Sequence, residues 1–235
     1  MSLEHLPCPK CGSHDALTMY DDGHSFCFSC NTYFPKGTQG IEATATAETA
    51  VKHDVIPSSD LEFKALGARG ITLATCQKYG YGQTTYKGEG CQVANYYDDN
   101  GNCTGQKLRF KDKKFQCLGK VGDRFYGQNL WQGGRKLVVT EGEIDCLTVS
   151  QLNDNKYPVV SIPNGAQSAK RVFLKNMEWL NSFDEVIVMF DMDEAGRKAT
   201  ESVCGVLELG KLKIATLSLK DANECLQKGM ADEVI

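Results

Sequence analysis

Val186–Gly196 reads VIVMFDMDEAG, an apolar run that stops abruptly in acids and a glycine, and Leu137–Asp145, LVVTEGEID, has the same form. Each run has the length of a buried strand. In an open parallel α/β sheet, ligands bind just outside the carboxyl ends of the strands. The two segments therefore predict a parallel sheet with Glu141, Asp191 and Asp193 converging at one of its edges.

Carboxylates gathered at one edge repel each other unless cations lie between them. Hard oxygen ligands at a partly open site favour Mg²⁺ or Mn²⁺, and Mg²⁺ usually keeps waters and substrate phosphates as its other ligands. Taken singly, Asp193 and Asp221 are expected helix N-caps, and Glu143 and Asp145 suit the positive end of a helix. Helix capping explains less well why Glu141, Asp191 and Asp193 all stand at strand ends. The same holds for Lys220 and Asp221, which follow the last strand. Phosphoryl transfer is the leading hypothesis.

The segment around these acids alternates strands and helices with short connections, which predicts a parallel sheet with right-handed crossovers. No GxGxxG motif follows the first strand and no GxxxxGK[ST] motif occurs, so neither a dinucleotide site nor a Walker-type ATPase is supported. The expected strands are 136–140, 159–163, 185–191 and 213–219, and the expected helices are 143–153, 167–181, 194–209 and one opening near 223.

The preceding segment, residues 61–134, predicts a small α+β subdomain. A helix is expected over 63–78 with a break at 67–70, and the turn signal at 98–101 predicts a hairpin of 94–97 with 106–110. Its aromatic residues are expected in the core rather than as platforms on which bases stack. The chain has a net charge of −4, yet residues 105–124 hold seven cations against two acids. This basic strip is either a solvated strand face or the footprint of a phosphate backbone. Its cations are Lys107, Arg109, Lys111, Lys113, Lys114, Lys120 and Arg124.

Two CxxC pairs, Cys8 with Cys11 and Cys27 with Cys30, are fifteen residues apart. This spacing predicts one structural Zn²⁺ with four thiolate ligands. A thioredoxin-type redox site would need a single CxxC in a βαβ setting, which is absent. The other seven of the eleven cysteines are scattered singly and are expected as small core or surface residues.

The turn before the second CxxC pair contains Asp22 and His24 beside several aromatic residues. Two interpretations are equally open. The turn is either a ribbon turn with a small hydrophobic face or a surface that hydrogen-bonds the bases of a single strand.

The expected organisation is a zinc ribbon over 1–35, a flexible Ala/Thr/Glu-rich linker over 36–60, the α+β subdomain over 61–134 and the parallel α/β sheet over 135–235. No apolar stretch approaches the roughly 20 residues of a membrane helix, and the N-terminus lacks the features of a signal peptide. We expect no membrane association and a cytosolic protein.

The acidic motifs resemble the TOPRIM domain of primases, topoisomerases and related nucleases. Together with the ribbon in front and KDANE at 220–224, the chain resembles the primase half of the bifunctional primase–helicases of short-tailed coliphage-type phages. The resemblance covers almost the whole chain, including ARGI at 68–71 and QKLR at 106–109. One departure is SIPNG at 161–165, which resembles the wider TOPRIM group and to which we assign no role.

The resemblance implies a DNA-dependent RNA polymerase that makes short primers on single-stranded DNA from ribonucleoside triphosphates. A replicative helicase, absent from this chain, and a DNA polymerase are the implied protein partners, in the host cytoplasm if the protein is phage-encoded. The chain is then a fragment or a stand-alone primase. The alternatives are a non-catalytic recombination mediator that also combines zinc with TOPRIM, and a TOPRIM nuclease or topoisomerase.

Residue roles follow from the same resemblance. Glu141, Asp191 and Asp193 are the expected magnesium ligands and catalytic residues, with Asp221 nearby and Glu141 also a candidate general base. Cations are expected to hold the triphosphate and template phosphates, and two polar residues of the ribbon to read template bases. The expected phosphate-binding residues are Arg69, Lys107, Arg109 and Lys113, and the expected base readers are Asp22 and His24.

Overall fold

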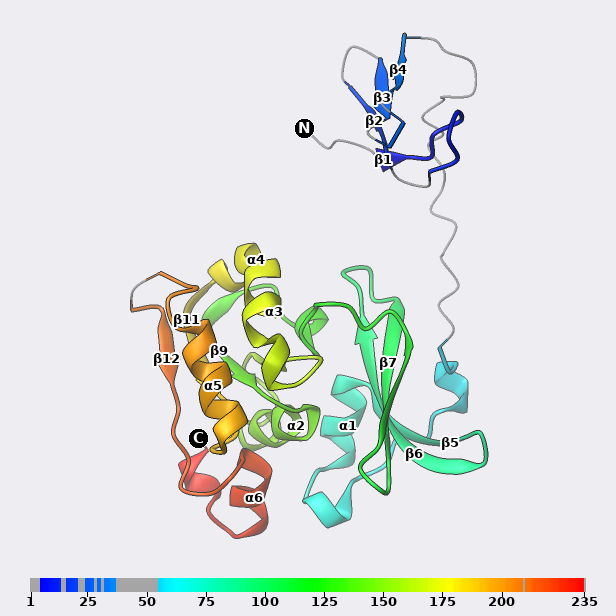
Figure 1. Ribbon diagram of the computed structural model, residues 1–235. Helices are drawn as coiled ribbons and strands as arrows, with labels where there is room; N and C mark the ends of the chain where they lie inside the picture. The colour runs from blue at the N-terminus through cyan, green and yellow to red at the C-terminus, as the bar shows by residue number, and fades with distance from the viewer. Residues whose placement is uncertain are drawn as a thin grey trace. The chain divides into compact units, whose positions relative to one another are not determined.

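The computed structural model describes residues 5–13, 16–20, 24–27, 29–30, 32–36, 55–208 and 210–234. The chain divides into two compact units, residues 1–51 and 52–235 (Figure 1). Most of the linker expected over 36–60 lies outside the described residues, and so does the candidate base reader Asp22.

The N-terminal unit is a small antiparallel sheet in the order β1-β2-β3-β4. Its hydrophobic core is small: among its described residues three hydrophobic side chains are buried, and two of them, Cys8 and Cys27, are cysteines, with Leu17 the third. A unit with so little apolar burial needs a metal or a comparable cross-link to be stable. The strands are β1 (His5–Leu6), β2 (Leu17–Met19), β3 (Ser25–Cys27) and β4 (Thr32–Phe34).

The C-terminal unit begins with α1 (Leu73–Tyr79) and an antiparallel sheet in the order β5-β6-β7-β8. The expected hairpin is confirmed, because β6 pairs with β7 across a turn in which Asp98 accepts hydrogen bonds from two backbone amides. The strands are β5 (Tyr81–Tyr86), β6 (Glu89–Tyr97), β7 (Cys103–Phe110) and β8 (Phe115–Gly119).

The helix expected over 63–78 is shorter than predicted. Thr72 caps it by accepting a hydrogen bond from the Thr75 amide, so the helix begins at Leu73. Upstream, Leu66 and Ile71 form an isolated bridge around a single 3₁₀ turn. That turn ends at Gly70 in the left-handed region, at φ 68°, which favours glycine.

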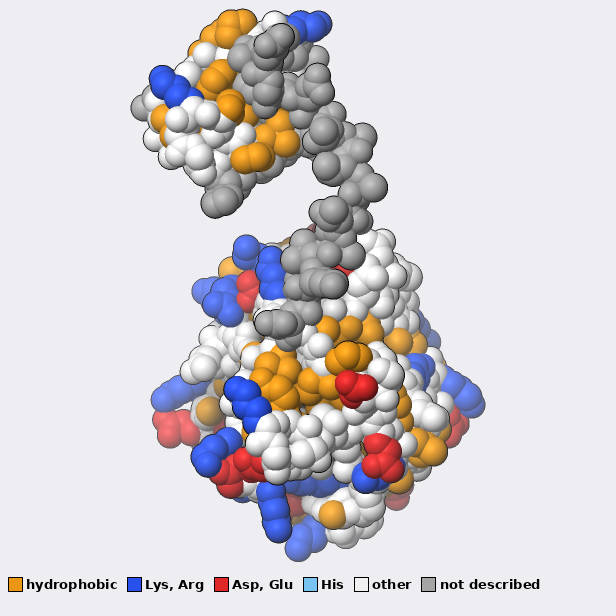
Figure 2. All heavy atoms as spheres, turned by 90° about the vertical axis from the view of Figure 1, so that its right-hand side faces the viewer, with side chains coloured by type: hydrophobic (Ala, Val, Ile, Leu, Met, Phe, Trp, Pro, Cys, Tyr) orange, Lys and Arg blue, Asp and Glu red, His pale blue; other side chains and the backbone are white. Residues whose placement is uncertain are grey.

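Strand β7 divides its side chains between two faces. Leu108 packs with Leu61 and Val93 on the outer face, whereas Lys107 and Arg109 lie on the other face, since alternate strand residues point to opposite sides. Figure 2 shows the outer side of this sheet, where hydrophobic side chains gather in the middle and lysine and arginine side chains lie around the margin.

The expected linker ends earlier than residue 60. The Gln106 side chain accepts a hydrogen bond from the Ile56 amide at 2.7 Å and donates one to the Ile56 carbonyl at 2.8 Å. Ile56 also packs against the outer core of the antiparallel sheet. Residues 55–60 therefore belong to the C-terminal unit, because Gln106 binds this segment as a neighbouring strand would.

The second sheet of the C-terminal unit is parallel throughout, in the order β10-β9-β11-β12, as predicted. Helices α3 and α5 cover one face, and α2 packs with α1 and α6 on the other (Figure 1). The strands are β9 (Gly134–Thr140), β10 (Val159–Ser161), β11 (Phe183–Met189) and β12 (Leu212–Ile214), and the helices are α2 (Glu143–Leu152), α3 (Ala169–Lys175), α4 (Met177–Asn181), α5 (Glu194–Val203) and α6 (Ala222–Gln227).

Several predicted elements of this sheet and its helices differ in length, three of them markedly. The helix expected over 167–181 breaks at Asn176, whose side chain donates to the carbonyls of Val172 and Asp123. Helix α5 ends at Val203, just before Gly205 takes a left-handed φ of 80°. Strand β12 is short because β11, with which it pairs, ends at Met189.

The two sheets of the C-terminal unit share one hydrophobic core. Tyr79, Tyr96 and Tyr126 from the first segment pack with Leu147 and Cys225 from the second. The tyrosine hydroxyls are hydrogen-bonded, for example Tyr79 to the Val159 carbonyl at 3.0 Å, so their burial is not penalised. Among the described residues, no helix has both the length and the apolar character needed to cross a membrane.

Candidate active site

The acids meet because β9 and β11 are neighbours. Thr140 and Met189 form the last pair of the two strands. Glu141 comes one residue after Thr140 and Asp191 two residues after Met189, at the same edge. A cavity of about 530 Å³ opens there. It is lined by residues that follow β9 and β11 and by the start of α2, and on the other side by the antiparallel sheet. The first group is Glu141, Gly142, Glu143, Ile144, Asp145 and Asp191, and the second is Lys107, Arg109, Phe115 and Cys117.

Glu141 is held in an environment that opposes its charge. Burial, reinforced by the negative charge of Asp191, raises the pKa of its carboxyl to about 6. One of its oxygens, Oε2, is buried without a hydrogen-bond partner. A buried carboxylate oxygen without a partner costs free energy, and such a cost is ordinary where the oxygen serves as a metal ligand.

Asp191 and Asp193 face a single cation. The Lys220 ammonium lies 3.2 Å from Asp191 Oδ2 and 3.3 Å from Asp193 Oδ2. Burial raises the pKa of Asp191, opposed by Lys220. A hydrogen bond from the Gly196 amide lowers the pKa of Asp193, which is the N-cap of α5 as predicted.

Gly196 keeps these acids in place. A Cβ at this position would lie 2.0 Å from the Asp191 carbonyl oxygen, so only glycine allows α5 to start so close to the loop. Asp221 is likewise a helix N-cap, accepting from the Glu224 amide at 2.7 Å. Asp193 and Asp221 are not among the residues lining the cavity, and they flank the Lys220 position instead.

Two acids of the cavity were not selected from the sequence. Asp145 lies four residues after Glu141, in the first turn of α2, and its Oδ1 accepts a hydrogen bond from the Asn223 amide at 3.0 Å. Burial, followed by the charge of Asp221, raises the pKa of Asp145 to about 7. Glu143 is buried and accepts from Tyr96 Oη at 2.6 Å. The E-x-x-x-D spacing from Glu141 was the available signal for Asp145.

The expected phosphate-binding cations divide between two cavities. Lys107 and Arg109 line the carboxylate cavity, whereas Arg69 and Lys113 line a second cavity of about 710 Å³. Arg109 lines both cavities. The predicted group is therefore arranged along a path from the carboxylates to the second cavity, rather than around one point.

Lys107 is already bonded. Its ammonium lies 2.9 Å from Glu143 Oε1, with side-chain exposures of 16% and 11%, and it donates to the Pro163 carbonyl at 3.0 Å. Pro163 belongs to the 161–165 segment, to which the sequence assigned no role, and Asn164 and Gly165 line the same cavity. Removing one partner of a largely buried pair leaves the other charge unpaired, so Lys107 shapes the cavity wall.

Phe115 is an exposed aromatic residue that the sequence did not single out. Its side chain is 53% exposed and lines the carboxylate cavity. Lys107 Nζ lies 5.2 Å and Arg109 Cζ 5.8 Å from the centre of its ring. An exposed ring between cations is suited to stack against a nucleobase.

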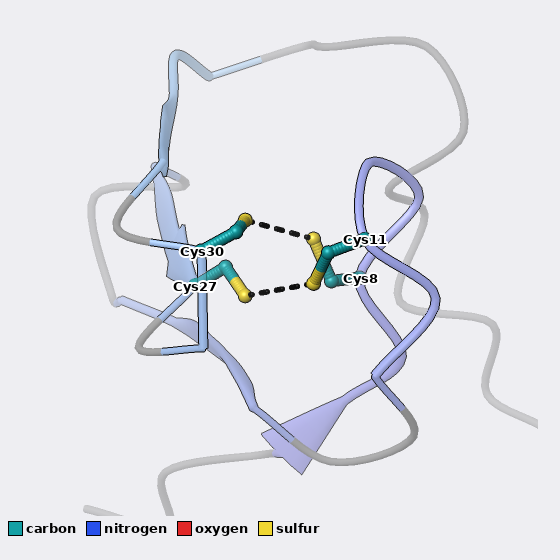
Figure 3. Close-up of side chains that lie close together, drawn as sticks. All are labelled: Cys8, Cys11, Cys27 and Cys30. Atoms are coloured by element: carbon teal, nitrogen blue, oxygen red, sulfur yellow. Dashed lines mark hydrogen bonds between the residues drawn. The ribbon is translucent and has the colours of Figure 1, made fainter.

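The four cysteines of the N-terminal unit point toward one another (Figure 3). Their Sγ atoms lie within 4.8 Å, with Cys8 and Cys30 at 3.8 Å and Cys11 and Cys27 at 3.7 Å. A tetrahedral ion with Zn–S bonds of about 2.3 Å separates its sulfurs by about 3.8 Å, whereas a disulfide needs about 2.05 Å. The thiols therefore fit a zinc ion. Within the described part of the chain, no three carboxylates approach one another as closely.

His24 lies in a row of aromatic rings. It stacks on Tyr20 with ring centroids 4.4 Å apart and planes at 9°, and its centroid lies 5.3 Å from that of Tyr33. Tyr33 is 58% exposed. The structure thus gives His24 two aromatic neighbours, Tyr20 and Tyr33, whereas residues 21–23 lie outside the described part of the chain.

Comparison with known proteins agrees with this architecture. Residues 62–119 match the family described as bacteriophage T7 DNA helicase/primase, N-terminal a+b fold, and residues 138–226 match the Toprim-like family. The chain superposes on the crystal structure of the primase fragment of the bacteriophage T7 primase-helicase protein with a TM-score of 0.76, at 43% identity, covering 99% of this chain and 97% of that one. The chain belongs to this phage primase family.

Other members of the family and more distant proteins extend the comparison. The DNA helicase/primase of Enterobacteria phage T3 is 44% identical over 231 residues, which are 95% of this chain and 41% of that protein. The chain thus spans less than half the length of this relative. A chain in the structure of the T7 lagging-strand DNA polymerase with primase domains is 48% identical, with a TM-score of 0.74, over 77% of this chain and 94% of that one. The DnaG catalytic core, 17% identical with a TM-score of 0.52 over 69% of this chain and 67% of that one, shares the fold.

Asp145→Asn should stabilise the protein in magnesium-free buffer at pH 8. Folding raises the pKa of Asp145 from 3.8 to about 7. The folded protein therefore binds a proton at Asp145 more tightly than the unfolded chain does. The wild type therefore loses stability as the pH rises from about 4 through 7. Asparagine does not titrate, so the variant should gain roughly 1–3 kcal/mol at pH 8, and this gain should vanish near pH 4–5.

Thermal melting at pH 5 and pH 8 measures the effect. Asp154→Asn, an exposed acid just beyond the other end of α2, is the matched control and should show no such pH-dependent gain. Equal melting temperatures for Asp145→Asn and the wild type at both pH values would show that the charged Asp145 carboxylate does not destabilise the folded protein.

Proposed function

We propose that this chain is a DNA primase, an RNA polymerase that makes short primers on single-stranded DNA from ribonucleoside triphosphates. The reaction joins a 3′-hydroxyl oxygen to the α-phosphorus of the next nucleotide and breaks the bond to pyrophosphate. The observation that carries the proposal is the single cavity in which strand-end carboxylates face Arg109 and Phe115 across the two sheets. Such a cavity has separate walls for metal ions and for a nucleotide.

The carboxylates fit a divalent cation. Glu141 has an unpartnered buried oxygen, and Asp191 and Asp193 hold a lysine ammonium between them, so the site already binds positive charge. We assign Mg²⁺, or Mn²⁺, to Glu141, Asp191 and Asp193, with Asp221 beside them. When bound, the cation would help to deprotonate the attacking hydroxyl and neutralise the leaving pyrophosphate.

The side chains of the site have distinct tasks in this scheme. Glu141, at the end of β9 in the cavity, is also the candidate to accept the hydroxyl proton. Arg109, which lines both cavities, binds oxygens of the triphosphate and of a template phosphate, and Phe115 stacks on the base. Arg69 and Lys113, in the second cavity shared with Arg109, bind template phosphates. Lys107 reaches a phosphate only by leaving Glu143.

The N-terminal unit would supply template recognition. We assign one structural Zn²⁺ to Cys8, Cys11, Cys27 and Cys30, whose spacing suits it. The exposed ring of Tyr33 beside His24 gives the ribbon a surface on which unstacked bases can lie. Asp22 remains a proposed base reader on the strength of the sequence.

The relatives suggest the partners. The T3 relative is a helicase/primase, and the T7 primase domains are described in a complex with a DNA polymerase, an RNA/DNA hybrid and dTTP. We propose that this chain acts with a replicative helicase and a DNA polymerase on single-stranded DNA. Because the relatives are phage proteins, the reaction belongs in the cytoplasm of an infected cell.

Primer synthesis on a pool of single-stranded DNA templates with ribonucleoside triphosphates and Mg²⁺ tests the proposal. Sequencing should recover short RNA products complementary to one shared template sequence, and Asp191→Asn should give none. Cleaved template without RNA would instead identify a TOPRIM nuclease. Bound template with neither product nor cleavage would identify a recombination mediator.

Arg109→Ala should flatten the salt dependence of template binding. Each phosphate contact releases counterions, so losing one should reduce the slope of log K against log [salt] by about 0.7 for a single strand. Fluorescence anisotropy of a labelled oligonucleotide between about 50 and 200 mM salt measures the slope. Lys213→Ala, an exposed cation on β12, is the charge-matched control. Identical slopes for Arg109→Ala and wild type would show that Arg109 contacts no template phosphate, and would favour the interpretation of the basic strip as a solvated strand face.

A further inference from the structure

Lys220 occupies an unusual position among the acids. Two hydrogen bonds hold its backbone. Its carbonyl accepts from the Met192 amide at 2.7 Å, and its amide donates to Glu224 Oε2 at 3.2 Å. Its side chain, 54% exposed, reaches back to Asp191 and Asp193 at 3.2 and 3.3 Å. The backbone is thus anchored, and the four-carbon side chain is the part that can move.

The acids near this ammonium come from several elements, and two of them contact it. Asp191 and Asp193 contribute the direct contacts, and Glu141, at the end of β9, is the next acid of the site. Lys107 and Arg109, the cations of the opposite wall, have other neighbours: Glu143 for the first and the Phe115 ring for both. The remaining acids around the loop are Asp145 from α2 and Asp221 and Glu224 at the start of α6.

We propose that Lys220 is an internal counter-ion, which holds the place of the divalent cation in the metal-free site and moves toward the triphosphate when metal binds. This inference rests on the proposed metal site. A cation bound by Asp191 and Asp193 would sit about 2.1 Å from their oxygens. The Lys220 ammonium would then face a doubly charged ion instead of two carboxylates.

Displacement is physically easy here. An ion pair whose lysine is half exposed contributes little to stability, and lysine is a flexible point charge that finds a new anion without a fixed geometry. The anion available at this edge is the triphosphate of the bound nucleotide. The Lys220 side chain would thereby neutralise the carboxylates of the metal-free site, and would add positive charge near the triphosphate once metal is bound.

The inference predicts two effects of opposite sign for Lys220→Met. Metal binding should become tighter, because no internal cation competes for the carboxylates. Nucleotide binding to the metal-loaded protein should become weaker, because one phosphate-facing charge is lost. A residue with a merely structural role would weaken both.

The test uses the full zinc-loaded chain and two probes. Mn²⁺ alone, titrated with electron paramagnetic resonance detection of the free ion, should bind Lys220→Met roughly 3–10-fold more tightly than wild type. A ribonucleoside triphosphate with a non-hydrolysable α,β-linkage, at saturating Mn²⁺, should bind it more weakly. Lys213→Met, which removes the same charge from β12, should match wild type in both titrations, and Lys220→Arg should stay near wild type.

The outcomes separate the two hypotheses. Unchanged or weaker Mn²⁺ binding by a Lys220→Met protein that melts normally would overturn the counter-ion inference and leave the metal site standing. Unchanged nucleotide binding would overturn the movement toward the triphosphate. Wild-type Mn²⁺ binding by Asp191→Asn would instead refute the proposed metal site itself.

Discussion

Asp191→Asn and Glu141→Gln are each expected to reduce dinucleotide synthesis by roughly 10²-fold or more while the protein stays folded. Both substitutions keep the shape of the side chain and remove one charged metal ligand. The structure also predicts the sign of the stability change. Burial raises the pKa of both carboxyls, so their charges oppose folding, and the neutral variants should melt at the same or a higher temperature without magnesium.

Asp184→Asn is the control for this pair. Asp184 is exposed at the opposite end of β11, on the same strand that leads into Asp191. It should retain full synthesis, measured as labelled dinucleotide per protein at saturating magnesium. Near-normal synthesis by both Asp191→Asn and Glu141→Gln would rule out this edge of the sheet as the catalytic site.

Cys27→Ser should remove zinc and abolish template-directed initiation. Structural zinc supplies about 10–16 kcal/mol in small zinc peptides, more than a unit with three buried hydrophobic side chains among its described residues can replace. Elemental analysis should find one zinc per wild-type chain and none in the variant. Extension of a preformed primer should survive, because the carboxylate site belongs to the other unit.

Cys204→Ser, an exposed cysteine after α5, should keep its zinc and both activities. Zinc-free wild-type protein, purified without chelator, would refute the four-cysteine site. Initiation by Cys27→Ser at the wild-type rate would show that the ribbon takes no part in template use.

The sequence predicted the parts of the site that depend on local pattern. Glu141 and Asp191 follow apolar strands, and in a parallel sheet the ends of neighbouring strands lie together, so their meeting follows from the pattern. Asp193 and Asp221 were expected as helix caps and as site residues, and the structure shows the caps. A capping carboxylate keeps a second oxygen available, so a capping role leaves a ligand role open.

The parts that were missed depend on contacts between the two sheets. The Lys107–Glu143 pair joins residues 36 positions apart, and no spacing in either segment predicts that the two would face each other. Phe115 looked like another core aromatic residue until β8 placed it opposite Arg109 at the cavity. The break of the 167–181 helix at Asn176 likewise depends on the Asp123 carbonyl from a distant loop.

The most direct test of the account is the position of a bound metal. Crystals of the zinc-loaded chain soaked in Mn²⁺ should show an anomalous difference peak between Glu141, Asp191 and Asp193, with the Lys220 ammonium moved away from both aspartates. A manganese peak bound only at other residues, with Lys220 still bridging Asp191 and Asp193, would contradict the assignment of this sheet edge as the metal-dependent polymerisation site.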